Sequence, residues 1–455
     1  MPAIITDRFK KEILLNLQKD IDSAANNYYV SVGRPIDWNG TDTAPTPTNA
    51  IRTIRDAQNN MTAIKNVEAH SFVIPRYTWS LGAIYQAYND NSVGHPTNSF
   101  YVITDENNIY VCLEAGQTAL GQSVTSTVKP TGTLTTAFET ADGYVWKFLY
   151  SVGALRASQF LSANFMPVTK FGPFDSDDAA DHVEQVGIQN AASAGEVVGY
   201  QVTSGGSGYT TVPTVEVIGN GVAANATATI SGGAVTKINV KDSDGNKAHG
   251  RNFTQAYVKI TGGNGSGAVA RPIIGPAAGF GADPRDDLKA TAMMFTAKPA
   301  GDEGSNWVIG NDFRQVTLIK NIEIPDSDAL YTGVTGNAMR RMKFSNISSS
   351  FSADKTILGS TSLANAYVVK SDSDEVWYIQ DSDTKFEPFV EGEVISETDG
   401  SGAGTLDASG VDGDSFAYIN GDVDISTGEV MYIDNRAAIQ RSADQTEDIK
   451  IIIQL

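Results

Sequence analysis

The chain has 455 residues, of which 41% are hydrophobic and 19% are charged, and its formal net charge is −20. Such an excess of acid argues against sequence-independent binding to nucleic acid or to an anionic membrane surface, because both would repel the chain at long range. A lone cysteine, Cys112, excludes an internal disulfide framework and any cysteine-based zinc or iron–sulfur site.

The N-terminal residues lack the ordered basic, apolar and small-residue regions of a signal peptide. The apolar runs are far shorter than the roughly 20 residues that span a bilayer. We therefore expect a protein that is made and assembled in a cytoplasm. The charge is concentrated at the C-terminal end: residues 371–455 contain 20 acidic and 4 basic residues, which gives −16. We expect these carboxylates to form a solvated β surface.

The first 25 residues predict an amphipathic helix capped by Thr6 or Asp7. Its apolar stripe consists of Phe9, Ile13, Leu14, Leu17 and Ile21. A strand over 28–32 follows, closed by Gly33-Arg34-Pro35. A Thr/Pro-rich loop then precedes a second helix from about Asn49. The inner face of this second helix is expected to carry Ile51, Ile54, Gln58 and Met61.

Short strands are predicted over 71–74, 100–103 and 109–113, and an aromatic-rich strand over 144–150. The turn sequence Asp105-Glu106-Asn107-Asn108 predicts a hairpin between the second and third of these strands. Cys112 falls in an apolar strand, where a small core residue is the expected role.

Composition changes between Gly195 and Gly275, where 81 residues hold 16 of the 43 glycines and no Leu, Met or Trp. β-Branched residues between glycine turns predict short strands here. A faint repeat relates residues 213–221 to 256–265. We expect a small, autonomous β module that is inserted into a larger domain, lies on the outside and can be removed while the rest stays folded.

Residues 346–425 are a second β-rich stretch, with a hairpin predicted within 391–406. The chain closes with a strand, a polar connection and a final strand over 449–454. We expect that last strand to be paired within a sheet, because an exposed apolar edge invites aggregation.

No motif for catalysis or metal binding is present in the sequence. The four histidines are at least 24 residues apart, and there is no phosphate loop or nucleophile elbow. The glycine clusters at 205–208 and 262–267 are interpreted as turns. Asp422–Ser426 departs from a calcium loop at its Gly and Glu positions. We therefore expect no enzyme activity, no cofactor and no metal, and a structural or binding role.

Four motifs resemble a known family. They are FVIPRYTW (72–79), ADGYVWKFLY (141–150), Phe313-Arg314-Gln315 before a strand, and GEVMYIDNRAAIQRSADQTEDIKIIIQL (428–455). The opening, with Gly33-Arg34 and Trp38, is also similar. The family is the baseplate wedge subunit encoded by gene eight of T-even-type contractile-tail bacteriophages, and the motifs occur in the family's order. The stretches near 175–280 and 346–425 have no clear counterpart in it.

The resemblance implies a mainly β fold of β-sandwich domains with a few helices. It implies a non-enzymatic structural subunit of the tail baseplate in a myovirus virion, assembled in the bacterial host cytoplasm. The implied partners are a second copy of the chain and other wedge proteins, with no nucleic acid, membrane or small-molecule substrate. A receptor- or glycan-binding tail protein is the alternative, since Trp79, Trp146, Trp307 and Trp377 could line a sugar site.

The same resemblance gives a domain plan and a set of structural signature residues. The plan is an N-terminal framework part (1–174), an inserted Gly-rich β module (175–280), a second framework part (281–345), a second inserted acidic β region (346–425) and closing strands (426–455). The signature residues are Pro75, Arg76, Trp79, Gly143, Tyr144, Trp146, Phe313, Arg314, Gly428, Glu429, Tyr432, Asn435, Arg436, Asp444, Gln445 and Glu447.

Overall fold

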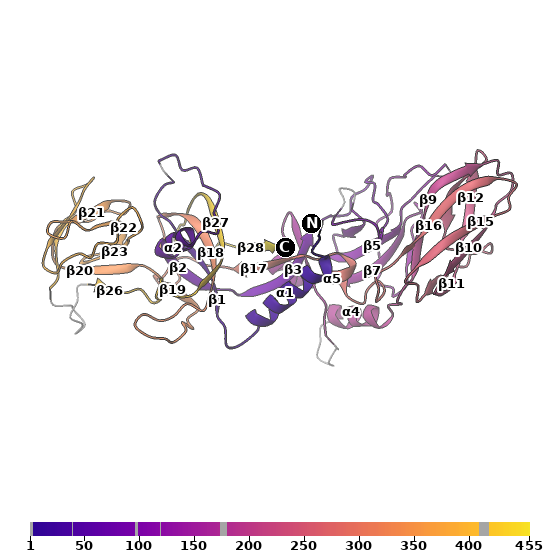
Figure 1. The fold of residues 1–455 in the computed structure, drawn as a ribbon. Coiled ribbons are helices and arrows are strands. Elements are labelled where there is room, and N and C mark those ends of the chain that lie inside the picture. Colours follow the sequence, from indigo (N-terminus) through magenta and orange to yellow (C-terminus); the bar gives the residue numbers. More distant parts are fainter. Residues whose placement is uncertain (1–2, 39, 96–98, 119, 173–179, 409–417) are drawn as a thin grey trace. The chain divides into compact units, whose positions relative to one another are not determined.

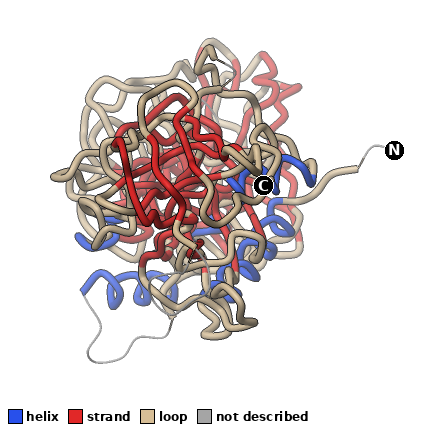
Figure 2. Tube along the Cα trace, turned by 90° about the vertical axis from the view of Figure 1, so that its left-hand side faces the viewer, coloured by secondary structure: helices blue, strands red, loops and turns tan. Residues whose placement is uncertain are grey.

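The computed structural model describes residues 3–38, 40–95, 99–118, 120–172, 180–408 and 418–455. The fold is mainly β, as predicted: strands and loops make up most of the chain, and the described helices are short (Figure 2). The helices are α1 (Asp7–Ile21), α2 (Ile51–Asn59), α3 (Ala154–Phe160), α4 (Ala180–Asn190) and α5 (Pro284–Asp287). Among the described residues, no helix has the length and apolar character needed to cross a membrane.

The chain divides into two compact units, each built from separate stretches of sequence. Unit 1 comprises residues 1–14, 71–294 and 453–455, and unit 2 comprises residues 15–70 and 295–452. The five consecutive segments predicted from the sequence are a finer division, which stays a prediction.

An antiparallel sheet of order β4-β5-β7-β6 forms the aromatic core of unit 1. Its strands are β4 (Tyr101–Ile103), β5 (Asn108–Glu114), β6 (Phe138–Glu139) and β7 (Val145–Ser151). The predicted hairpin is confirmed, with Tyr101 opposite Val111 and Asn107 at a φ of 61° in the turn. Cys112 is fully buried in this core, as expected, together with Tyr110, Trp146 and Phe148.

A second sheet has the order β28-β17-β3-β8. Its strands are β3 (Ala69–Pro75), β8 (Phe165–Val168), β17 (Ala292–Ala297) and β28 (Ile449–Gln454). The final strand of the chain is therefore paired within a sheet, as predicted.

Residues 197–274, called here the glycine-rich module, form eight strands that pair with one another (Figure 1). The strand pairs are β9–β16, β10–β15, β11–β14 and β12–β13. The strands are β9 (Val197–Ser207), β10 (Thr214–Gly219), β11 (Val222–Ala224), β12 (Thr227–Ser231), β13 (Ala234–Asn239), β14 (His249–Arg251), β15 (Ala256–Thr261) and β16 (Ser266–Ile274). Side chains including Tyr209, Val235 and Ile238 fill a small core of its own.

The two copies of the faint repeat are hydrogen-bonded neighbours, because β10 and β15 pair with Val215 opposite Ile260. The ends of the module also meet: the Gly275 N–H donates to the Glu196 carbonyl at 2.8 Å. The turn predicted at 205–208 is mostly wrong, because residues 205–207 lie inside β9. Gly205 is opposite Ala268, and the register shifts between Val269 and Ala270.

The five-stranded sheet of unit 2 has the order β19-β2-β1-β18-β27. Its strands are β1 (Tyr28–Gly33), β2 (Met61–Asn66), β18 (Asp312–Lys320), β19 (Thr335–Asn337) and β27 (Glu429–Gln440). Two long antiparallel pairings hold it, β1 with β18 and β18 with β27. Tyr29, Ile64 and Ile319 lie in its core.

The seven-stranded sheet of unit 2 has the order β23-β22-β21-β24-β25-β20-β26, with β23 also pairing to β20. Its strands are β20 (Arg340–Ser349), β21 (Thr356–Gly359), β22 (Asn365–Ser371), β23 (Glu375–Ile379), β24 (Val394–Glu397), β25 (Ala403–Leu406) and β26 (Tyr418–Ile419). The predicted hairpin within 391–406 is confirmed as β24–β25, with Val394 opposite Thr405.

The carboxylates of the acidic C-terminal part differ in how far they are buried. Several of its carboxylates are exposed, but Asp381, Glu393 and Glu397 are buried. Glu393 accepts hydrogen bonds from the backbone N–H groups of Thr361 and Ser362 at 2.8 and 2.9 Å. These three carboxylates therefore depart from the expected solvated surface, whereas the other described carboxylates of 371–455 are exposed or partly exposed. A buried carboxylate that accepts several N–H bonds fixes the loops that donate them.

The two N-terminal helices bury less than their patterns predict. In α1, Leu14 is buried, but Phe9 and Ile13 are 56% and 41% exposed. In α2, Ile51 is 69% exposed, so its predicted place on an inner face is wrong. Met61 is buried but belongs to β2, a strand that the sequence did not predict.

Candidate functional site

Arg314 fixes the described residues 34–38 and 40–50, called here the anchor loop, which connect β1 to α2. The side chain is 5% exposed and its guanidinium donates to the Pro35 carbonyl at 2.5 Å. It also donates to the carboxylates of Asp37 at 2.6 Å, Asp42 at 2.5 Å and Asp312 at 3.0 Å. The planar guanidinium has five donors in a fixed arrangement, so it can hold several acceptors at once. Its hydrogen bond lowers the pKa of the Asp42 carboxyl.

The next residues of β18 and β27 continue this attachment. Gln315 donates to the Asn435 side chain at 2.8 Å, and Asn435 donates to the Pro45 carbonyl at 3.0 Å. The Trp38 indole donates to the Arg436 carbonyl at 3.0 Å. The strand edge is therefore covered by the loop at this point, because a loop side chain takes the hydrogen bond that another strand would otherwise make.

Three of the signature segments thus come together in unit 2. Gly33 lies opposite Gln315, and Gln315 lies opposite Asn435. A Cβ on Gly33 would lie 2.2 Å from the Asn60 carbonyl oxygen, so only glycine fits there. Arg34 stacks over Trp38 at 4.2 Å. Three of the segments quoted for the resemblance are therefore structurally connected here, although they lie far apart in the sequence.

A second cluster forms around Arg441, which is 2% exposed. Its Nε donates to Glu447 at 2.8 Å, and Gln445 donates to the same carboxylate at 3.0 Å. The guanidinium lies over the Trp307 ring at 5.0 Å. Asp444 lies beside them in sequence but is exposed. Glu447 and Gln445 therefore hold a buried arginine in place. The sequence analysis did not identify Arg441 as a structural residue.

The remaining signature residues of unit 2 shape the start and outer face of β27. Gly428 has a φ of +75°, a left-handed conformation that favours glycine. Glu429 is exposed, and Tyr432 is half-buried opposite Leu318. Phe313 is buried on β18.

In unit 1, the first signature segment attaches β3 to the loop before β8. Pro75 ends β3 and pairs with Phe165. Arg76 donates from its side chain to the Ser162 carbonyl at 2.9 Å and from its backbone to the Asn164 carbonyl at 2.8 Å.

The second signature segment of unit 1 contributes to the aromatic core. Tyr144 stacks on Trp146 at 5.7 Å and donates to the Val124 carbonyl at 2.5 Å. Trp79 packs against the same cluster and donates to Ser126 at 3.1 Å. Gly143 precedes them in a turn with a φ of +80°. These tryptophans are therefore core residues, and the interpretation of Trp79 and Trp146 as a sugar platform is not supported.

Buried titratable groups do not assemble into a reaction centre in the described part of the chain. Burial raises the pKa of the Cys112 thiol, which disfavours a nucleophilic thiolate. Asp287, at the end of α5, is 1% exposed and accepts from the Gly281 N–H at 2.7 Å. Burial raises the pKa of the Asp287 carboxyl too, opposed mainly by the hydrogen bond from Gly281. No group of three potential metal ligands occurs among the described residues.

The calcium-like segment uses its carboxylates internally. Asp424 accepts from the Ser426 N–H at 2.8 Å, and Asp422 accepts from the Asn337 N–H at 2.8 Å. Both contacts stabilise turns around β27 and β19.

Neither a protein-family model nor a curated protein matches the chain.

Proposed function

We propose that the chain is a non-enzymatic structural subunit of a phage tail baseplate wedge that joins neighbouring wedge proteins during tail assembly and contraction. The observation that carries this proposal is the meeting of the Gly33–Trp38, Phe313–Gln315 and Asn435-Arg436 segments at one place in unit 2. Segments that resemble one family in order, and that also contact one another, are more specific together than any of them alone.

Exposed apolar side chains near the N-terminus agree with an assembly role. Ile4, Ile5, Phe9 and Ile13 are 82%, 59%, 56% and 41% exposed. Apolar residues gathered on one short segment are typical of surfaces that become buried against a partner. We therefore expect this segment to contribute to a contact with a second copy or with another wedge protein.

Sedimentation of the purified chain with the other wedge proteins of its phage tests the proposal. We expect a dimer of the chain alone and a defined larger complex in the mixture. The double variant Phe9→Asp/Ile13→Asp should weaken one of these associations, whereas Arg52→Asp, at an exposed position of α2, should not. A chain that joins no wedge intermediate under any of these conditions would refute the proposed function.

A further inference from the structure

The glycine-rich module is attached to the rest of unit 1 by ion pairs that all have the same polarity. In each pair the cation lies on the module and the anion on the sheet or on the loop before β4. The pairs are Lys237–Glu114 at 3.6 Å, Lys247–Glu139 at 2.9 Å and Arg271–Asp90 at 2.6 Å. Charge complementarity of this kind fixes orientation more than it adds affinity, so it can hold two surfaces in register without filling all the space between them.

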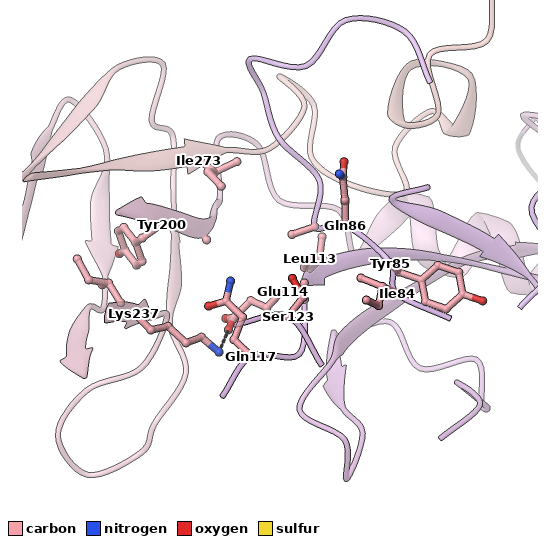
Figure 3. A pocket seen from close by; sticks show the side chains of 14 residues that line it. Ile84, Tyr85, Gln86, Leu113, Glu114, Gln117, Ser123, Tyr200, Lys237 and Ile273 are labelled. Atoms are coloured by element: carbon pink, nitrogen blue, oxygen red, sulfur yellow. Dashed lines mark ion pairs between the residues drawn. The ribbon is translucent and has the colours of Figure 1, made fainter. Parts of the chain in front are cut away.

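A cleft of about 270 Å³ remains at this junction (Figure 3). Its apolar lining includes Leu113 on β5 and Ile273 on β16, with the Tyr200 side chain on β9 beside them. The Lys237–Glu114 pair crosses one side, and Tyr85 directs its hydroxyl away from the space. Clefts with an apolar base and a few convergent polar groups are the usual form of small-ligand sites.

Three polar side chains that line the cleft are available to bind a ligand. Gln86, Gln117 and Ser123 line it, and none of them makes a side-chain hydrogen bond to another residue in the part of the chain that the structure describes. Gln117 and Ser123 are held beside each other by a β-bridge. Two amides and a hydroxyl can donate and accept at the same time, which suits a ligand that also does both.

The charge of the lining selects a class of ligand. Glu114 and Lys237 are the charged residues that line the cleft, and they neutralise each other. The lining therefore favours a ligand that has no net charge. Its combination of an apolar and aromatic surface with free amide and hydroxyl groups matches a ring that has one apolar face and several hydroxyls at its edge.

We propose that this cleft binds a neutral saccharide of one or two rings. A peptide that pairs with β5 is the weaker candidate, because β5 is already paired on both sides, with β4 and β7. The proposal is independent of the wedge assignment, since a saccharide site could exist on a tail component of any kind.

Saturation-transfer NMR on the full chain tests the proposal with glucose, N-acetylglucosamine, lactose and maltose. Inorganic phosphate, sialic acid and a neutral tetrapeptide are the comparison ligands. A ligand of this size with ordinary efficiency gives a Kd of roughly 1 mM. We expect at least one neutral sugar to bind near that value and to bind more tightly than the charged or peptide ligands.

Gln117→Ala should weaken sugar binding about tenfold, the effect of one lost hydrogen bond. Gln122→Ala is the matched control, because Gln122 is exposed in the same turn and does not line the cleft. Both variants should keep the melting temperature of the parent. Three results would each overturn the proposal. They are no binding of any neutral sugar up to roughly 20 mM, tighter binding of the peptide than of the sugars, and equal weakening of sugar binding by both variants. A variant that loses sugar binding should still assemble with the wedge proteins, so the two proposals can fail separately.

Discussion

Replacing Arg314 with methionine tests whether one guanidinium holds the anchor loop. The substitution keeps an apolar stem of similar length and removes all four hydrogen bonds. The bond to the buried Pro35 carbonyl contributes about 1.5–3 kcal/mol as a charge-assisted bond. The three carboxylates are 36–61% exposed and regain water when released, so their pairs add little to this loss. We expect a total loss of about 2–4 kcal/mol.

The loss should appear first as local opening of the loop. Hydrogen–deuterium exchange measures it directly, and an opening free energy lower by about 2–4 kcal/mol raises exchange roughly 30- to 1,000-fold. Peptides covering residues 34–48 should show this increase, while the glycine-rich module should exchange as in the parent. The Trp38 indole, which is 6% exposed, should become accessible to acrylamide.

The stability of the anchor loop should decrease as the pH falls. The pKa of Asp42 is lowered in the folded state by its hydrogen bond to Arg314, so its stabilising effect is present above the unfolded pKa of about 3.9. That effect is lost as pH falls through the lower, folded pKa. Protection of the loop should therefore persist at pH 5 and decline below about pH 4.

Arg52→Met is the matched control, because Arg52 is 79% exposed and lies 3.7 Å from Asp56 within α2. Its loss should change stability by less than about 0.5 kcal/mol. Unchanged exchange of residues 34–48 in Arg314→Met, or the same increase in Arg52→Met, would refute the reasoning.

Three further predictions concern unit 1. Asp287→Asn should raise the melting temperature at pH 8 but not at pH 4. The pKa of Asp287 is raised in the folded state, so its ionisation destabilises the fold once pH exceeds the unfolded pKa of about 3.9. An equal shift of the melting temperature at both pH values in calorimetry would contradict this. Replacing Tyr200–Pro272 with an Asn-Gly turn should leave a folded chain, because β9 and β16 already pair at that point, and insoluble product would count against it. Arg271→Ala, which loses bonds of 2.6 Å to Asn89 and Asp90, should cost about 1–2 kcal/mol in urea unfolding and make the module easier to cleave with protease, whereas Lys259→Ala should cost less than about 0.5 kcal/mol.

The sequence predicted best where local signals are strong. The turn at 105–108 and the β-branched runs of the glycine-rich module define their strands without distant partners. The apolar stripe of α1 predicted a helix correctly but not its burial, because periodicity shows which face is apolar and not what covers it. Phe9 is 56% exposed for that reason. The division into two units could not be predicted either, since each unit combines stretches from both ends of the chain.

The candidate sites depend on contacts between distant residues, which one sequence does not show. Arg314 in an apolar strand was a signal that acidic partners should exist, but nothing identified Asp37 and Asp42 as those partners. The cleft at the module junction draws its lining from Gln117 on a turn and Tyr200 on a strand, among other segments. No spacing rule connects such residues before the fold is known.

The burial of Cys112 has a practical consequence for following this protein as it assembles. Its thiol is 0% exposed and burial raises its pKa, so the native chain should react very slowly with maleimides. Any cysteine introduced at an exposed position then becomes the one fast-reacting thiol. Fluorophores placed in turn at Phe9, in the anchor loop and on the glycine-rich module would report which of these surfaces loses solvent when a partner arrives, without first removing a native cysteine.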